Sequence, residues 1–507
     1  MKILYLPLDE RPCNYEYPQM ICDISGNIEI LLPDIEILSK KKKAANISRI
    51  WQWLDDNGDK CDAAVLSIEM LVYGGLLPSR IHNMSESLCI ERVKRLAQWK
   101  QKNPDVKVYV SNLIMRTPSY SSNEEEPDYY EQYGEMIFRY GWLKDKQNRQ
   151  KLNEEEKNEL KYLSNNIPDV VINDYEERRR KNIKVNMEIL HLVKEKIIDF
   201  LVIPQDDSAP YGYTAIDQRL IADIITKERL QFRVQTYPGA DEAGCTLVSK
   251  AFTDYFNKQP HVYVTYSSTL GAQIIPKYED RPFGESVKAH ILAAGACITE
   301  DINQADIVLM VNSPGKLMQE AWEQNTKDIT YNSFRNLIDF VDKIDMYLKQ
   351  GKKCIIADIA FSNGADIELI AMMDERKLLD KIHAYAGWNT ACNTLGTVLA
   401  SGIVGLYNNS DYHRLKNMIY RLMEDWSYQA IVRQNTINHV LPLFNATFYE
   451  FKGCEDNICN SICEQLQEIW EKQIKYSFRD WKVKVERVFT PWHRMFEIGI
   501  DLTIKKE

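Results

Sequence analysis

The run Phe200-Leu201-Val202-Ile203-Pro204-Gln205-Asp206-Asp207 places two adjacent carboxylates directly after a continuous apolar segment. Such a segment is typical of a strand that is covered on both faces of a sheet. Pro210 and Gly212 follow, and both residue types favour turns, so we expect the strand to end before the aspartates. The stretch therefore predicts a buried strand whose end carries acidic side chains.

Eight further apolar runs have the same form, and each is followed by a loop and a helical stretch. They cover residues 3–8, 63–68, 106–110, 234–237, 262–266, 307–311, 354–357 and 382–385. Strands that alternate with helices indicate a parallel sheet, and eight such units close a (β/α)8 barrel. We therefore expect an α/β fold, with a TIM-like (β/α)8 barrel over residues 1–400 and one strand outside it. An open doubly wound sheet, or two smaller α/β domains, is the alternative.

Two regions depart from this alternation. Residues 120–197 are polar and rich in helix-forming residues, which predicts a helical insertion. We expect its charge clusters, such as Glu124-Glu125-Glu126, to lie on exposed helical surface. Residues 401–507 are expected to form a C-terminal α+β accessory region, with helices first and short strands after them.

Composition restricts the class of partner and the compartment. The chain has 507 residues and a formal net charge of −10, which argues against a nucleic-acid partner because phosphate binding needs a concentrated basic surface. No apolar run is long enough to predict a membrane span, and the N-terminus leads into a strand without a signal-peptide pattern. Eleven cysteines are scattered through apolar segments, as is usual for reduced thiols. We expect a cytoplasmic protein with neither a nucleic-acid nor a membrane partner.

The ends of the predicted strands carry carboxylates, amides, arginines and one tryptophan, which suit a ligand rich in hydroxyl groups. In a barrel these ends meet on one face, where active sites lie. The candidate binding residues are Asp9, Arg11, Arg116, Asp241, Asn363, Trp388 and Asn389. Trp388 would offer a flat face to a sugar ring. Helix capping is the alternative for Asp241 and Asn389, and ion pairing with the strand-end acids is the alternative for Arg11, Arg80 and Arg116.

Asp206 and Asp207 are the candidate catalytic residues. Paired carboxylates are the usual groups for hydrolysis of a glycosidic bond, and two acids beside a buried strand are costly unless they are used or paired. We expect Asp207 to be the general acid and Asp206 to orient the substrate or stabilise charge, which requires different pKa values. The hypothesis is a metal-independent glycoside hydrolase with a small-molecule or oligosaccharide substrate and no cofactor.

Two alternatives stay open. The same carboxylates could hold Mg²⁺ or Mn²⁺ in a metal-dependent hydrolase or lyase. The third possibility is a carbohydrate- or metabolite-binding protein without catalytic activity. A zinc site is not expected, because the chain has only eight histidines and none lies in the strand-end motifs.

Several motifs along the chain form a specific combination. They are Leu6–Pro12, Tyr73–Leu76 with Ser79-Arg80, Met115–Pro118, Gln205–Asp207, Ala386–Thr390 with Asn393–Gly396, and Pro491–Glu497. Together they resemble a bacterial family that is catalogued as domain of unknown function 4127. The resemblance spans essentially the whole chain and implies a bacterial origin, but it implies no activity. Glu69 departs from the family pattern, in which we expect an aspartate, and this argues against a chemical role at that position.

A weaker similarity of pattern is to barrel N-acetyl-hexosaminidases. Those enzymes use an adjacent aspartate pair after the fourth strand and carry a Trp-Asn motif after a late strand, as Trp388-Asn389 does here. Fold-level analogy of this kind raises the expectation of a glycosidase without establishing it.

Overall fold

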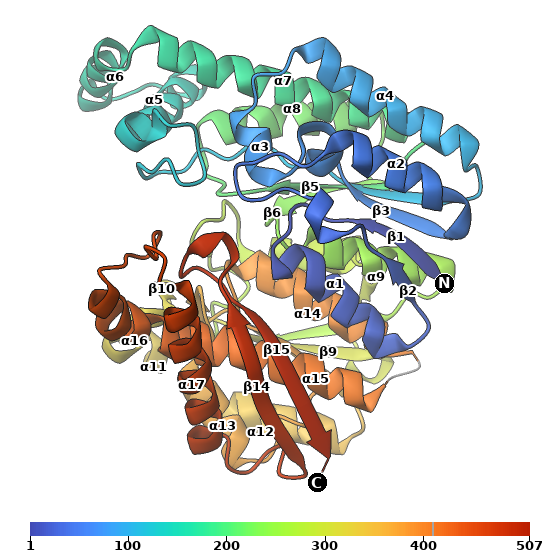
Figure 1. The fold of residues 1–507 in the computed structure, drawn as a ribbon. Coiled ribbons are helices and arrows are strands. Elements are labelled where there is room, and N and C mark those ends of the chain that lie inside the picture. The colour runs from blue at the N-terminus through green and yellow to red at the C-terminus, as the bar shows by residue number, and fades with distance from the viewer. Residues whose placement is uncertain (408–409, 507) are drawn as a thin grey trace. The chain divides into compact units, whose positions relative to one another are not determined.

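The computed structural model describes residues 1–407 and 410–506, which form a mixed α/β fold (Figure 1). All nine predicted strands are present. They are β1 (Lys2–Leu6), β3 (Ala63–Ser67), β4 (Lys107–Ser111), β5 (Phe200–Gln205), β6 (Val234–Pro238), β7 (His261–Tyr266), β9 (Ile307–Asn312), β11 (Lys353–Asp358) and β13 (Ala384–Ala386). Strands β3, β5 and β9 are buried along their whole length, as expected for parallel strands with helices on both faces.

The remaining elements connect or extend these strands. The shorter strands are β2 (Glu29–Leu31), β8 (Cys297–Ile298), β10 (Gln319–Glu320) and β12 (Phe361–Ser362). The connecting helices are α1 (Pro12–Ser25), α2 (Ile47–Asn57), α3 (Leu76–Ile81), α4 (Glu86–Lys102), α8 (Tyr213–Lys227), α9 (Ala243–Tyr255), α10 (Phe283–Ala293), α11 (Thr330–Ser333), α12 (Leu337–Lys349), α13 (Ile367–Glu375) and α14 (Ala391–Gly405).

The strands are divided between two sheets, and the order of the strands follows the same pattern in both. One has the order β2-β1-β3-β4-β5-β6, and the other has the order β13-β11-β9-β7-β8. In the six-stranded sheet β1 lies between β2 and β3, and in the five-stranded sheet β7 lies between β8 and β9. In each sheet, therefore, the second strand along the chain lies on one side of the first strand, and the third strand lies on its other side. The registered pairs of the long strands are parallel. This is the doubly wound order of flavodoxin-like sheets, in which ligands bind beyond the carboxyl ends of the strands.

The predicted α/β fold with parallel sheets is confirmed. A closed (β/α)8 barrel is not shown in residues 1–407 and 410–506, because the nine strands belong to two sheets and neither order connects its last strand to its first. The sequence could not separate these outcomes, since both architectures repeat a buried strand followed by a helix.

The chain forms two compact units. Unit 1 contains residues 1–10, 30–247 and 278–280, and unit 2 contains residues 11–29, 248–277 and 281–507. These units divide the chain differently from the predicted regions 1–400 and 401–507, whose status as separate domains stays a prediction.

The helical insertion lies in unit 1. It consists of α5 (Tyr130–Arg149), α6 (Glu154–Asn166) and α7 (Asp169–Lys194), as the sequence predicts. These helices have a hydrophobic core of their own, which includes Ile137, Leu143 and Tyr175 together with Met115 from the loop after β4. Helices α5 and α7 both contact α8, so the insertion packs on the helical layer beside the six-stranded sheet (Figure 1).

The C-terminal part of unit 2 has the predicted sequence of helices followed by strands. Helix α15 (Asp411–Arg421) continues into a π-helix over Leu422–Val432, and α16 (Arg433–Asn435) and α17 (Glu455–Gln473) follow. Strands β14 (Trp481–Phe489) and β15 (Gly499–Lys506) pair in antiparallel fashion. No helix in the described part of the chain combines the length and the apolar content needed to cross a bilayer.

Candidate functional site

The aspartate pair lies in a turn immediately after β5, as predicted. Strand β5 ends at Gln205, and Asp207 has a φ of 43°, in the left-handed region. Each aspartate side chain keeps 21% of its surface exposed. The turn therefore ends the alternation of the strand and leaves both carboxylates at the carboxyl edge of the six-stranded sheet.

Each aspartate pairs with a different arginine. Asp206 Oδ2 accepts from Arg80 at 2.7 Å, and Asp207 Oδ2 accepts from Arg116 at 3.1 Å. Arg80 comes from α3, and Arg116 comes from the loop after β4. The structure thus brings the predicted residues Asp206, Asp207 and Arg116 together, and it confirms that arginines of neighbouring strand ends pair with the acids.

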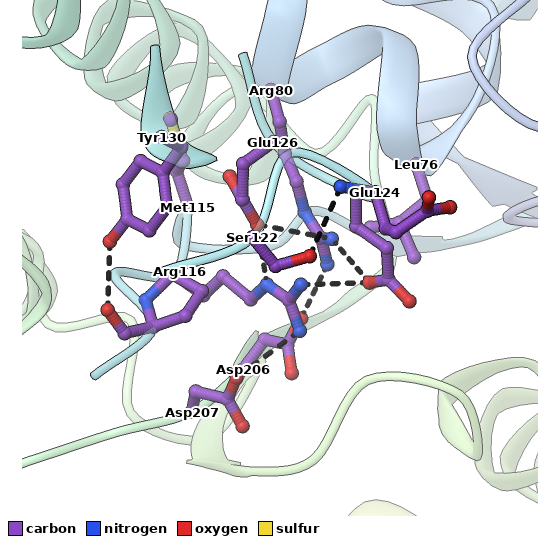
Figure 2. Close-up of polar contacts among 12 residues, drawn as sticks. Leu76, Arg80, Met115, Arg116, Ser122, Glu124, Glu126, Tyr130, Asp206 and Asp207 are labelled. Atoms are coloured by element: carbon purple, nitrogen blue, oxygen red, sulfur yellow. Dashed lines mark hydrogen bonds and ion pairs between the residues drawn. The ribbon is translucent and has the colours of Figure 1, made fainter. Parts of the chain in front are cut away.

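Glu125 and Glu126 connect the two arginines, and both lie in the loop that enters the insertion. Figure 2 shows Glu126 beside Arg80 and Arg116. Glu125 Oε2 accepts from Arg80 at 3.0 Å and from Arg116 at 2.8 Å. Glu126 Oε1 accepts from Arg116 Nε at 2.7 Å and from Arg80 at 3.5 Å. Two guanidinium groups are therefore shared among four carboxylates, and the charge-assisted bonds fix the positions of all six groups.

The expectation that these glutamates lie on exposed helical surface is wrong. Glu126 is only 1% exposed, and the segment is a loop that precedes α5. The sequence held a signal for this, because Glu126 precedes Pro127 and the residue before a proline disfavours helical geometry. Arg116 lies 10 residues before Glu126 and Arg80 lies 46 residues before it, and no local pattern in the sequence showed that these groups would meet.

Helix α7 of the insertion holds the two segments that carry the arginines, which are α3 and the loop after β4. The Tyr175 hydroxyl donates to the Arg116 carbonyl oxygen at 3.0 Å, and the Asn182 amide donates to the Ser79 carbonyl oxygen at 2.9 Å. Further along, Asn186 Nδ2 donates to Asn112 Oδ1 at 2.7 Å. The insertion is thus a support for the site, since three of its polar side chains fix the backbone or side chains that surround the aspartates.

The two aspartates have unequal electrostatic surroundings. Burial raises the pKa of Asp207 to about 7, and the neighbouring Asp206 carboxylate adds to this increase, while Arg116 and Arg80 oppose it. An acid with a pKa near 7 exists in both protonation states at neutral pH, which is the requirement for a general acid. The arrangement can therefore supply a proton from one carboxyl group while its neighbour is paired with Arg80.

A small polar cavity lies next to the arginines. It has about 10 Å³ of room for the centre of a water molecule, and its polar lining includes Glu69, Tyr73, Arg80, Asn112, Asn182 and Asp206. Glu69 begins a π-helical turn (Glu69–Tyr73) directly after β3, and its carboxylate accepts from the Asn112 side chain at 2.9 Å and from the Leu113 N–H at 2.8 Å. Burial raises the pKa of Glu69 to about 7, and these hydrogen bonds oppose that increase.

The remaining predicted residues of unit 1 are also buried. Asp9 follows β1 and is 1% exposed, and Asp241 follows β6 and is 6% exposed. Glu10, beside Asp9, accepts from the Ser39 hydroxyl at 2.6 Å and from the Lys41 N–H at 2.7 Å. Lys41 in turn pairs with Glu124 at 2.6 Å, which connects the end of β1 to the acidic loop.

The predicted binding residues of unit 2 are Arg11, Asn363, Trp388 and Asn389. The backbone N–H of Asn363 donates to the Asn389 carbonyl oxygen at 2.9 Å, so these two residues are brought together. Arg11 lies elsewhere in this unit, where it pairs with Glu497 at 3.5 Å and lies over the Trp492 ring at 4.6 Å.

Trp388 is a core residue of unit 2. It is 1% exposed, its indole N–H donates to Thr397 at 3.3 Å, and the Tyr17 ring meets it edge-on at 5.5 Å. Packing and hydrogen bonding account for a tryptophan at this position. A role for its ring in stacking on a sugar stays a prediction.

The donors in these clusters also bear on metal binding. In residues 1–407 and 410–506, no group of three or more histidine, cysteine, aspartate or glutamate side chains has an arrangement that could hold a metal ion. At the aspartate pair, the guanidinium groups of Arg80 and Arg116 lie where a cation would otherwise neutralise the carboxylates.

Fold and site together define an α/β protein with parallel sheets and a charged cluster at the carboxyl edge of one sheet. The chain belongs to the family described as "Protein of unknown function (DUF4127)", which matches residues 3–501. The resemblance seen in the motifs is thereby confirmed over nearly the whole chain. A comparison with curated proteins gave no match.

Proposed function

We propose that the protein is a hydrolase that cleaves a glycosidic bond, with Asp207 as the general acid. The observation that carries this proposal is the adjacent pair of carboxyl groups after β5, each 21% exposed and each bonded to its own arginine. Burial raises the pKa of Asp207 to about 7. A carboxyl group whose surroundings raise its pKa is the usual general acid of a glycosidase.

Asp206 would then orient the substrate or stabilise the positive charge that develops on the sugar. Its carboxylate is held by Arg80 and keeps 21% of its surface exposed, so it is both fixed and within reach of a ligand. This role needs no metal ion. A closed barrel is not needed either, because parallel strands of an open sheet also present their carboxyl ends to ligands. A cytoplasmic location stays part of the proposal.

The test is hydrolysis of a panel of aryl glycosides by the wild-type protein and by Asp207→Asn. We expect at least one glycoside to be cleaved with EDTA present, and Asp207→Asn to lower kcat by about 10²- to 10⁴-fold, the usual contribution of a general acid. Activity of the wild type should fall as the pH rises through about 7, because Asp207 then loses its proton.

Asp128→Asn is the matched control, since this aspartate lies near the same loop and its side chain is 97% exposed. It should leave kcat unchanged. Loss of activity on chelation with recovery in Mn²⁺ would contradict the proposal and favour the metal-dependent alternative. Binding of glycosides without turnover would favour a binding protein.

A further inference from the structure

One residue that lines the cavity beside Arg80 and Asp206 carries a buried polar group without a partner among the described residues. The Tyr73 hydroxyl is buried, and within the described residues it has no hydrogen-bond partner. A buried hydroxyl without a partner costs about 1–3 kcal/mol, and a water molecule usually supplies the missing bond. The cavity has about 10 Å³ of room for a water centre, which is close to what one molecule requires.

Glu69 provides a second partner for a molecule in this cavity. The residue is 2% exposed, and its Oε1 already accepts two N–H bonds, from Asn112 and Leu113. Its Oε2 accepts the Ser67 hydroxyl at 3.2 Å, and no other side chain among residues 1–407 and 410–506 is recorded as donating to this oxygen. A carboxylate oxygen can accept a further hydrogen bond, so Oε2 has unused capacity. Glu69 and Tyr73 begin and end one π-helical turn, an element that often occurs at functional sites.

The cavity also adjoins the proposed catalytic pair. Asp206 and Arg80 are part of its lining, and Asp206 keeps 21% of its side chain exposed. A water molecule held between Glu69 and Tyr73 would thus lie beside the carboxylate that is proposed to face the substrate. The proposed function assigns an acid but no base, and Glu69 is the buried carboxylate that lines this cavity next to Asp206.

We propose, resting on the proposed function, that this cavity binds the water molecule that attacks the glycosidic bond, and that Glu69 accepts its proton. The water oxygen forms the new bond to the anomeric carbon while the bond to the leaving oxygen breaks. One proton of the water passes to Glu69, and the leaving oxygen takes the proton of Asp207. Solvent then returns a proton to Asp207 and removes one from Glu69, which restores the resting state.

The first test is a crystal structure of the wild-type protein, in which we expect one ordered water within hydrogen-bond distance of the Tyr73 hydroxyl and Glu69 Oε2. The second is the kinetics of Glu69→Gln, with Glu154→Gln, whose side chain is 84% exposed, as the control. Glu69→Gln should lower kcat by about 10²- to 10⁴-fold, the usual contribution of a general base, with little change in KM.

A pH profile separates a base from a merely structural carboxylate. The base must be ionised, so kcat/KM of the wild type should fall as the pH falls below about 7. This acidic decline should be absent in Glu69→Gln. Glu69→Asp keeps a carboxylate, so it should keep the decline and retain more activity than the glutamine variant.

Tyr73→Phe tests the water without removing a charge. We expect a decrease in kcat of about 2- to 10-fold, which corresponds to the loss of one hydrogen bond. The control is Tyr162→Phe, which should leave kcat unchanged because Tyr162 is 61% exposed. This variant decides the question if Glu69→Gln does not fold.

Wild-type kcat in Glu69→Gln while Asp207→Asn is inactive would overturn this inference and leave the proposed function intact. A dry cavity together with wild-type kcat in Tyr73→Phe would also overturn it. If Asp207→Asn keeps full activity, the proposed function itself fails.

Discussion

The adjacent side chains of Asp206 and Asp207 have different surroundings, because each one bonds to an arginine from a different distant segment. Asp206 meets Arg80 from α3, and Asp207 meets Arg116 from the loop after β4. Their adjacency was visible in the sequence, and so was the end of the strand before them. The raised pKa of Asp207 depends on its burial in the folded chain, which the sequence does not record.

The raised pKa of Asp207 has a consequence for stability. An unfolded aspartate has a pKa near 3.9, so between about pH 4 and pH 7 the folded protein binds the extra proton. Its stability contribution is therefore present at low pH and is lost as the pH rises toward 7. Asp207→Asn removes this loss. The free energy of unfolding of the variant, relative to that of the wild type, should therefore increase by on the order of 2 kcal/mol between pH 5 and pH 8.

The measurement is the difference in Tm between Asp207→Asn and the wild type at pH 5 and at pH 8. We expect this difference to shift in favour of the variant at the higher pH. Asp128→Asn should show no such shift, because its side chain is 97% exposed. A difference that is the same at both pH values would show that Asp207 does not carry the raised pKa.

At the scale of elements, the turn between the Glu69–Tyr73 segment and α3 sets the position of Arg80. Gly74 and Gly75 have φ values of 87° and 129°, and α3 begins at the next residue, Leu76. The N–H groups of both glycines donate to the Glu69 carbonyl oxygen at 3.0 Å. These conformations are accessible to glycine and costly for other residues, which explains why two glycines occur here.

Gly75→Ala should therefore lower the stability of the protein more than Gly351→Ala does. A Cβ at position 75 would lie 2.7 Å from Ser39 Oγ, whereas at Gly351, which also has a positive φ of 76°, it would meet no atom within 4 Å. We expect Gly351→Ala to cost about 1 kcal/mol from backbone strain and Gly75→Ala to cost about 1–3 kcal/mol more from the contact.

Differential scanning calorimetry of the two glycine variants gives the comparison. Gly75→Ala should have the lower Tm, and it should also lower any hydrolytic activity, because α3 carries Arg80. Equal values of Tm would mean that Ser39 moves aside without cost and that the turn is less constrained than the structure indicates.

At the scale of the whole molecule, the chain consists of two compact units, each with a doubly wound sheet. The aspartate pair, both arginines, the acidic loop and the cavity all belong to unit 1. Trp388, Asn363 and Asn389 belong to unit 2 and lie in a different set of contacts. The insertion in unit 1 has a hydrophobic core of its own, and β11 in unit 2 is buried from Cys354 to Asp358. Loss of packing at either place should therefore affect mainly the elements around it.

Leu143→Ala and Ile356→Ala test this separation. Leu143 is fully buried in the core of the insertion, and Ile356 is 1% exposed in β11. Each change should lower the free energy of unfolding of the surrounding elements by about 2–5 kcal/mol, because it removes buried packing. Hydrogen exchange should increase in α5, α6 and α7 for Leu143→Ala, and in β9, β11 and α12 for Ile356→Ala. Equal increases in both units for either variant would contradict independent cores.

The sequence by itself determined the nine strands, the helical insertion and the position of the aspartate pair, because these depend on local patterns of apolar residues, turns and charges. Sheet membership was decided by tertiary structure, since a repeated strand and helix is compatible with one barrel or with two open sheets. The burial of Glu126 and Trp388 was decided there too, because part of their surroundings comes from distant residues, Arg80 and Tyr17. Long-range contacts also assembled Arg80, Arg116, Glu69 and Tyr73 around one cavity, and no local pattern records such contacts.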